Sequence, residues 1–434
     1  MRKKSLLALL MSVLILLGTT VFPAADGVSY EIISPYNDID WSTIGAYKSN
    51  FHVHTTFSDG NVSLKDVTEA YYALGYHVLA VTDHGVVGLP WDKVPQTAFP
   101  LDIQNWFKER PVLTAARIAE MAAGVGRDGG VGMVGVPTGI EMNAAVLTKS
   151  HVNGFFAAWG QGYWGIENDY RTAIACTQEN GGISFINHPG DWLGSSGSDD
   201  TAKDPTNVNF FADILREYSS CLGIEIYNRV DTVTRRDRVL WDELLRRLIP
   251  EGRTVWGFAN DDSHALSDIG STAEFLFMKD NSLESIRAAM ENGVFLASSR
   301  YDRLVLGDDF QADLSVNFPM ITKMKIDDKK DIITLETKDT TRVEWIADGK
   351  VIATGGNIHL RDYADKITTY VRAQLTGPGG ITTTQAFICD DEAKDFTRID
   401  DGLKGWDRFK YYFELFLQSN ILVQAIIKII DAIK

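Results

Sequence analysis

Short apolar runs alternate with amphipathic helical patterns over most of the chain up to about residue 305. After Ser63, a favourable helix N-cap, Leu64, Val67 and Tyr71 recur at helical spacing, and Gly75 ends this helix. We predict strands that end near residues 54, 82, 140, 187, 227, 259, 278 and 297, with further helices at 112–123, 170–179 and 283–292. This alternation is typical of a parallel sheet or barrel, in which the loops after the strands carry the chemistry.

The pattern changes after about residue 310. Short strands are predicted at 332–337, 342–347, 350–353, 370–375 and 382–389 with no helix between them, and Asp348-Gly349 indicates a tight hairpin. We therefore predict a small antiparallel β-sandwich over 310–392. The segment that precedes residue 46 shows little periodicity and is interpreted as a short lead-in. An amphipathic helix is predicted at 403–434, where it could lie on a membrane surface, dock on its own domain or dock on a partner; we favour docking.

The first 25 residues have the pattern of an export signal. A basic start at Arg2, Lys3 and Lys4 precedes an apolar run from 6 to 17, and small residues follow at 24 and 25. Because the cleavage site is imperfect, an uncleaved N-terminal anchor is the alternative to a signal peptide. Either reading places the protein outside the cytoplasm, secreted or membrane-anchored.

Charge and composition narrow the classes of function. The 434-residue chain is 45% hydrophobic and 23% charged, with a net charge of -16, so no basic field would gather nucleic-acid phosphates. An acidic protein can still act on a phosphate ester if metal ions supply the positive charge locally. Cys176, Cys221 and Cys389 show no close spacing and do not indicate a disulfide framework.

Candidate chemistry gathers after the predicted strands. His52 and His54 lie one residue apart at a strand end and share a face, and Asp59 follows before the turn at Gly60. Imidazoles with a carboxylate suit zinc, manganese or iron. The other candidates at or near predicted strand ends are His84, Glu141, His151, His188, Asp262 and His264. Of the 8 histidines only His77 and His359 fall outside this pattern, and we interpret them as structural or exposed.

These motifs resemble the polymerase-and-histidinol-phosphatase (PHP) metallohydrolase family. The resemblance covers residues 46–305 and rests on His-x-His-Thr-x-x-Ser-Asp-Gly, Thr-Asp-His, Gly-Ile-Glu, Ser-His, Asn-His-Pro and Asp-x-His in that order. It implies a distorted seven-stranded β/α barrel with two or three divalent metal ions at the strand ends, followed here by the β-sandwich and the C-terminal helix.

The resemblance also implies a ligand set. The first metal would be held by His52, His54, Glu141 and Asp262, the second by Asp59, His84 and His264, and the third by His151 and His188 with Glu141 as a bridge. All of these except His151 are also predicted to be catalytic. Asp83 and Asn260 would orient ligands. Asp261 competes with Asp262, and we choose Asp262 because it fits the Asp-x-His spacing.

The predicted function is a metal-dependent phosphoesterase that uses a metal-activated water on a small-molecule phosphate ester, with no nucleic-acid partner. Arg229 and Arg300, which follow predicted strands, are candidates to bind the substrate phosphate. Ser184 and Cys176 have no motif around them, which disfavours a covalent mechanism.

Two alternatives stay open. The same metals could hydrolyse a carboxyl or carbamate ester, for which the aromatic segments 91–106 and 155–164 would suit an apolar substrate. Alternatively, an inactive barrel could act as a surface binding module, although nine buried polar ligands would then have no purpose.

Overall fold

The computed structural model describes residues 29–100, 102–143, 150–165, 170–193, 198–229 and 234–391, with 403, 405–406, 409–411 and 413. The predicted signal segment lies outside the described residues, as does most of the predicted C-terminal helix. Within the described part, no helix combines the length and apolarity needed to cross a membrane. Tyr411 is described, and its buried side chain donates a hydrogen bond to Asp213 at 3.0 Å. Docking of the predicted C-terminal helix as a whole stays a prediction.

The first predicted strand–helix–strand unit is present. Its elements are β2 (Gly45–Asn50), α2 (Leu64–Ala73) and β3 (Val78–Leu79), and β4 (Val134–Gly135) follows after α3 (Ala115–Ala122). The three strands pair in parallel in the order β2-β3-β4. Ser63 caps α2 as predicted, since its hydroxyl accepts the amide of Asp66. Regular pairing of β2 ends at Asn50, so His52 and His54 lie just beyond it.

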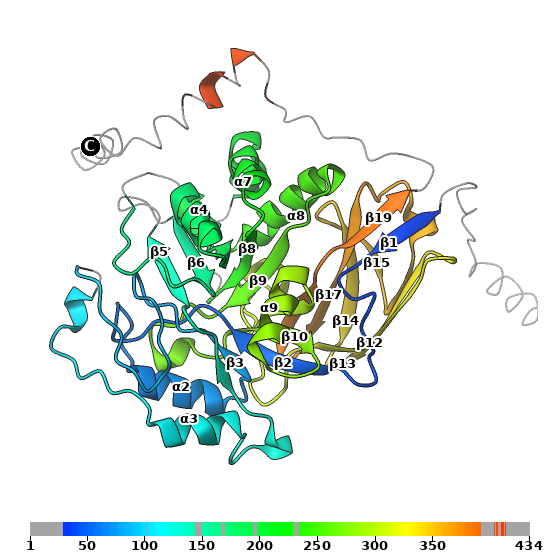
Figure 1. Cartoon of the computed structure of the whole chain (residues 1–434). Coiled ribbons are helices and arrows are strands. Elements are labelled where there is room, and N and C mark those ends of the chain that lie inside the picture. Colours follow the sequence, from blue (N-terminus) through cyan, green and yellow to red (C-terminus); the bar gives the residue numbers. More distant parts are fainter. Residues whose placement is uncertain are drawn as a thin grey trace, which may run out of the picture.

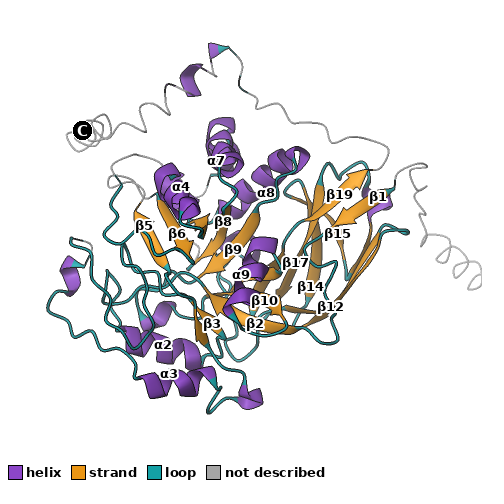
Figure 2. Cartoon of the chain, viewed as in Figure 1, coloured by secondary structure: helices purple, strands orange, loops and turns teal. Residues whose placement is uncertain are grey.

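A second sheet has the order β5-β6-β7-β8-β9. Its strands are β5 (Ile140–Asn143), β6 (His151–Phe155), β7 (Ile183–Ile186), β8 (Cys221–Asn228) and β9 (Trp256–Asn260). The helices of this region are α4 (Arg171–Glu179), α5 (Pro189–Leu193), α6 (Asp199–Lys203), α7 (Pro205–Glu217) and α8 (Asp237–Leu248). Figure 2 shows α4, α7 and α8 along one side of this sheet. Apolar side chains of α7 and α8 share a core with those of β7 and β8.

The two sheets meet beyond the carboxyl ends of β2, β3 and β9. Parallel bridges join Val53 to Ser263 and His84 to Glu141, so the segments after β2 and β3 lie beside the segment after β9 and the beginning of β5. The mixed α/β class is thus confirmed, but among the described strands the hydrogen-bonded ladders form separate sheets and no closed barrel. The ladders are interrupted because β3 and β4 are very short and β6 runs antiparallel to both neighbours.

The sheet of β2 continues into the C-terminal region. β10 (Thr272–Met278) pairs with β2, β11 (Phe295–Ser299) pairs with β10, and β18 (Gly380–Thr384) pairs with β11, all antiparallel. α9 (Leu283–Asn292) connects β10 to β11, and α10 (Arg303–Leu306) follows. This sheet contains strands of both predicted domains, and β11 of the first is hydrogen-bonded to β18 of the second. The domain boundaries stay a prediction.

The C-terminal region is built from antiparallel strands in two layers with a shared apolar core. Its strands are β12 (Met320–Asp327), β13 (Ile332–Lys338), β14 (Arg342–Ala347), β15 (Lys350–Thr354), β16 (Asn357–His359), β17 (Tyr370–Gly377), β18 (Gly380–Thr384) and β19 (Phe387–Asp391). The interpretation of the first residues as a lead-in is wrong in part. They form β1 (Tyr30–Ile33), which pairs with β19 at the far end of the chain, as Figure 1 shows.

Candidate metal centre

The histidine pair after β2 is fixed by backbone hydrogen bonds on both sides. The amide of Phe51 donates to the side chain of Asn260 at 2.7 Å, and that of Val53 donates to Thr82 at 3.0 Å. The amide of His54 donates to the carbonyl of Ser263 at 3.0 Å. Segments after β2, β3 and β9 therefore converge, and the imidazoles of His52 and His54 are fully buried there.

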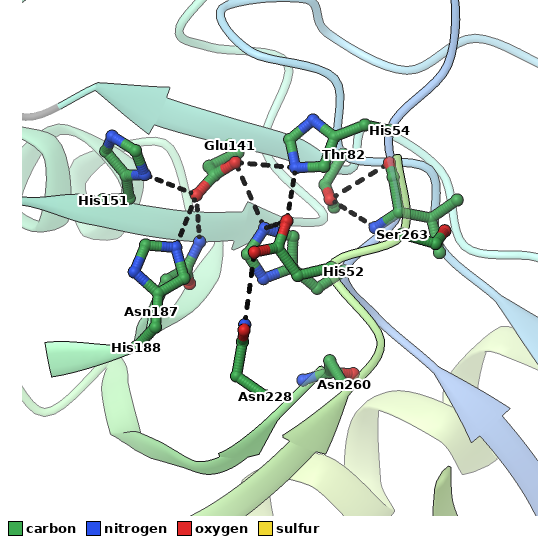
Figure 3. A network of polar contacts seen from close by, with 12 residues as sticks. His52, His54, Thr82, Glu141, His151, Asn187, His188, Asn228, Asn260 and Ser263 are labelled. Atoms are coloured by element: carbon green, nitrogen blue, oxygen red, sulfur yellow. Dashed lines mark hydrogen bonds and ion pairs between the residues drawn. The ribbon is translucent and has the colours of Figure 1, made fainter. Parts of the chain in front are cut away.

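Glu141, on β5, lies at the centre of the cluster (Figure 3). Its Oε2 atom is 3.1 Å from Nε2 of His52, 2.9 Å from Nε2 of His54 and 3.2 Å from Nδ1 of His84. Its Oε1 atom is 3.0 Å from Nδ1 of His151 and 3.4 Å from Nε2 of His188. One buried carboxylate is thus surrounded by imidazoles from five separate positions of the chain.

The four residues predicted for the first metal form one compact group: His52, His54, Glu141 and Asp262. Oδ1 of Asp262 is 3.4 Å from Nε2 of His52 and 3.1 Å from Nε2 of His54. Donor atoms of a tetrahedral zinc site lie about 3.3 Å apart, so these spacings fit a small divalent cation. Nε2 of both histidines and Oε2 of Glu141 are buried without a hydrogen bond, as atoms facing a cation would be.

The predicted second site is also assembled. Asp59, His84 and His264 form a group together with His54. Oδ2 of Asp59 is 3.2 Å from Nε2 of His264 and 3.6 Å from Nε2 of His84. The side chains of Asp59 and His264 are partly exposed, so this group lies on the open side of the cluster.

The predicted third site is grouped differently. His151 lies with Glu141 and His84, whereas His188 lies with His52 and Glu225. Both histidines still approach Oε1 of Glu141, so the bridging position of that carboxylate is retained. The structure therefore brings all nine predicted ligands together, and the rings of both His84 and His188 lie 5.1 Å from that of His151.

Glu225 is a site residue that the sequence analysis missed. It lies on β8 and is fully buried, and its carboxylate has four donors. Nδ1 of His52 and the side chain of Asn260 contact Oε1 at 2.9 and 3.1 Å, and the amide of His188 and the side chain of Asn228 donate to Oε2 at 3.0 and 3.1 Å. The available signal in the sequence was a single carboxylate inside an apolar strand. Because burying an unpaired charge is costly, such a residue is expected to have a partner.

Two further aspartates lie beside the cluster: Asp83, which was predicted to orient ligands, and Asp261, the alternative to Asp262. Asp83 accepts the amide and hydroxyl of Thr55 at 2.7 and 2.6 Å and the hydroxyl of Ser58 at 2.7 Å, which shapes the loop that carries Asp59. Asp261 instead accepts the hydroxyl of Tyr71 at 2.9 Å and the amide of Thr272 at 2.7 Å. Asp261 is thus committed elsewhere, and Asp262 is the residue that faces the histidines.

The buried charges are strongly coupled. Burial lowers the pKa of His52, but the carboxylates of Glu141, Asp262 and Glu225 outweigh it and hold the pKa well above its ordinary value. Burial raises the pKa of Glu141, but the surrounding imidazoles, led by His84, hold it well below its usual range. Positive charge is therefore required to keep these acids ionised in a buried site, and divalent cations would supply it.

The two candidate arginines have different surroundings. Nε of Arg229 donates to the carbonyl of Asp262 at 2.7 Å, and Nη2 lies 3.1 Å from Oδ1 of the same residue and against the ring of His264. Arg229 therefore faces the cluster and is partly exposed. The expectation for Arg300 is wrong. Its guanidinium donates to the carbonyls of Gly379 at 2.9 Å and Val316 at 3.3 Å, because the β11–β18 pairing carries it into the C-terminal region.

Two histidines and two aromatic segments remain from the sequence analysis. His77 accepts the amide of Lys48 at 3.0 Å, and His359 contacts Asp362 at 3.0 Å, so both lie outside the cluster as predicted. Among the aromatic residues of the two predicted segments, Trp91 and Phe155 are buried in the core, whereas Trp106 and Trp164 are exposed. Only part of these segments is thus available to a substrate.

Comparison with known proteins agrees with this geometry. Residues 50–186 match the family model of the PHP domain, from the strand before His52 to the end of β7. This chain carries a PHP domain. The matched range holds six of the predicted ligands, His52, His54, Asp59, His84, Glu141 and His151, and the other three predicted ligands follow it in sequence.

A stretch of 94 residues is 31% identical to the DNA polymerase/3'-5' exonuclease PolX of Bacillus subtilis. It covers 20% of this chain and 16% of that protein, so the chain spans about a sixth of the length of this relative.

Two solved structures show more distant likeness. A two-domain protein from Bacteroides vulgatus containing a predicted PHP-like metal-dependent phosphoesterase is similar over 86% of this chain and 96% of its own, with 17% identity and a TM-score of 0.41. The lesion-specific endonuclease EndoQ from Pyrococcus furiosus is similar over 60% of each chain, with 13% identity and a TM-score of 0.33. Neither likeness is close enough to establish a shared activity.

Proposed function

We propose that this protein is a metal-dependent phosphoesterase that cleaves a small-molecule phosphate ester with a metal-activated water. The observation that carries the proposal is the convergence of six imidazoles and three acids in one cluster, in which five of the imidazoles surround the carboxylate of Glu141 and buried donor atoms without hydrogen bonds face one another. A distorted barrel closed by the bridges after β2 and β3 would account for this convergence.

Two or three divalent ions would fit the donor sets. The first would lie among His52, His54, Glu141 and Asp262, the second would lie beside Asp59, His84 and His264, and a third would lie near His151 or His188. Mixed imidazole and carboxylate donors suit manganese, zinc or iron. When bound, such ions supply a reactive water near neutral pH and neutralise charge on the phosphate.

The chain's own residues position these groups. Glu225 holds Nδ1 of His52, so that Nε2 is directed at the cation, and the partly exposed Asp59 and His264 mark the side from which a substrate enters. On that side the guanidinium of Arg229 can donate to a phosphate oxygen while it stays paired with Asp262. The eight predicted catalytic residues would act in this arrangement as ligands.

The test uses purified protein loaded with manganese or zinc and an aryl phosphate ester. We expect hydrolysis that is lost with chelator and lost in the His52→Ala plus His188→Ala double variant. Full activity in that variant would refute the assigned site. Because exposed aromatic residues flank the centre, a carboxyl or carbamate ester is the second candidate substrate. Faster cleavage of matched carboxylic esters than of phosphate esters would favour that candidate.

We also propose that the protein is exported and does not act on nucleic acid. The basic and apolar start of the chain supports export, and the net charge of -16 opposes nucleic-acid binding. The amphipathic pattern after residue 403 supports contact of the C-terminal segment with a membrane surface or with its own domain. Detection of the native protein outside the cytoplasm by fractionation would test the export proposal.

A further inference from the structure

An exposed apolar surface lies on the loop between β3 and α3. It consists of Phe99, Ile103, Trp106 and Phe107, which are 67%, 57%, 52% and 100% exposed, and we call these four residues the apolar rim. The rings of Phe99 and Trp106 pack against each other with centroids 5.4 Å apart, so part of the rim is ordered by its own contacts. Large apolar side chains gathered on one short segment commonly mark a binding surface.

The rim is attached directly to the loop that carries Asp59. Asn105 belongs to the short 3-10 helix η1 (Ile103–Asn105), and its buried side chain donates to the carbonyls of Ser58 and Gly60, both at 2.7 Å. The neighbouring Gln104 donates to the carbonyl of Asp59. Three consecutive carbonyls around one proposed metal ligand are thus held by the segment that carries the rim.

The other end of the rim segment is also braced. Asp102 accepts the indole N–H of Trp106 at 3.2 Å and pairs with Arg110 at 3.0 Å. Lys108 donates to the side chain of Asn61 at 3.1 Å, which adds a contact to the Asp59 loop. The apolar rim is therefore a fixed extension of the open side of the metal centre.

We infer that the apolar rim binds the non-phosphate part of the substrate, so that the enzyme acts on phosphate esters of apolar alcohols. The inference rests on the proposed function and specifies its substrate class. An ester whose phosphate lies between Arg229 and the partly exposed Asp59 and His264 would direct its alcohol outward, along the loop to which the rim is bonded. Covering even one rim side chain with an alkyl chain would favour binding about tenfold or more.

The test compares n-propyl phosphate with n-octyl phosphate below its micelle concentration. Both alcohols are primary and have similar leaving-group chemistry, so intrinsic reactivity is matched and the chain length alone differs. We expect a kcat/KM at least about tenfold higher for the octyl ester, expressed mainly in KM. In Phe107→Ser and Ile103→Ser this preference should fall, because kcat/KM for the octyl ester decreases more than kcat/KM for the propyl ester.

Leu314→Ser is the matched control, because Leu314 is 68% exposed but lies in the loop before β12. Binding of n-propyl and n-octyl phosphonate, measured by calorimetry, supplies a readout that needs no turnover. Equal binding of the two phosphonates, or a preference that survives in Phe107→Ser, would overturn the inference even if both esters are hydrolysed. Failure to hydrolyse either ester, with octyl phosphonate still bound through the rim, would instead overturn the proposed function.

A membrane is the competing occupant of such a surface. Sedimentation with vesicles of phosphatidylcholine and phosphatidylglycerol should give the same bound fraction for the wild-type protein and for Phe107→Ser. Co-sedimentation that depends on Phe107, without any chain-length preference among soluble esters, would assign the rim to a lipid surface and overturn the inference.

Discussion

Nδ1 of His52 lies 2.9 Å from Oε1 of Glu225, on the opposite side of the ring from the nitrogen that faces Glu141. A carboxylate at Nδ1 fixes that nitrogen as the protonated one, so the lone pair of Nε2 is directed into the centre. The same carboxylate accepts the amide of His188, which has a φ of 26°, a strained value for a residue other than glycine. Glu225 thus positions two proposed ligands at once.

Replacing Glu225 with glutamine should weaken metal binding without unfolding the protein. The glutamine side chain keeps the shape and can still accept a hydrogen bond, but it loses the charge that supports the imidazole. We expect metal affinity to fall about 10–100-fold, measured by competition with a chromogenic chelator.

Glu274→Gln is the control for that experiment. Glu274 is also a fully buried carboxyl group, on β10, and it accepts the amide of Ala259 at 3.0 Å. Burial raises its pKa well above the ordinary value, which favours the neutral form, and glutamine is a neutral side chain of the same shape. An equal loss of affinity in the two variants would show that Glu225 acts only as a buried polar group.

The sequence predicts site residues best where a polar residue directly follows an apolar strand. His52, His84 and Asp262 each follow such a strand, so their convergence follows from strand alternation alone. Glu225 was missed because it lies inside β8 between Ile224 and Ile226, where the pattern indicates an ordinary buried strand. The resemblance to a known family set the ligand grouping, and the structure adds His84 beside His151 and Glu225 beside His188.

Long-range pairing explains the other departures. β1 is only four residues long and gains its place by pairing with β19, about 360 residues away, which no local pattern encodes. Arg300 follows a correctly predicted strand, but β11 pairs with β18 on that edge and directs the guanidinium to Gly379. Pairing between strands far apart in the sequence thus determines which strand ends lie at the metal centre.

Arg229→Met should reduce activity, whereas Arg300→Met should reduce stability. Loss of Arg229 removes a charged donor from the open side of the site, so we expect kcat/KM for a phosphate ester to fall about 10–100-fold, with the thermal midpoint little changed. Loss of Arg300 leaves backbone carbonyls such as that of Gly379 without their donor. We expect a lower thermal midpoint and an unchanged KM in the folded fraction. A KM increase confined to Arg300→Met would reverse the two assignments.

Asn105→Ala should reduce activity on every ester to a similar degree. The alanine cannot bond the carbonyls of Ser58 and Gly60, so the loop of Asp59 loses its attachment to η1. We expect weaker binding of the second metal, measured as loss of one ion per chain during dialysis, and a lower kcat at any chain length. Phe107→Ser should keep its full metal content, which separates the anchoring residue from the apolar rim.

Chelation should destabilise the folded protein. Glu141 and Asp262 are buried and ionised, and removing the cations leaves protonated imidazoles and the guanidinium of Arg229 to balance them. We expect the thermal midpoint to fall on addition of chelator and to recover with manganese or zinc. In Glu141→Gln the chelator should have a much smaller effect, because one of the buried charges has been removed. An equal shift in both proteins would place the stabilising ion elsewhere.

A histidine remote from the metals should make stability depend on pH. Burial, with the positive charges of Arg127 and Lys48, lowers the pKa of His77 to about 4, against 6.5 in an unfolded chain. Between these values the unfolded chain binds a proton that the folded protein does not, so the free energy of unfolding falls as the pH drops from 6.5 to 4. His77→Gln can still accept the amide of Lys48 but does not titrate, and it should flatten this part of the profile. The comparison is made by denaturant titration of metal-loaded protein, with His359→Gln as the exposed control. Parallel profiles for the wild-type protein and His77→Gln would show that other groups cause the loss of stability in acid.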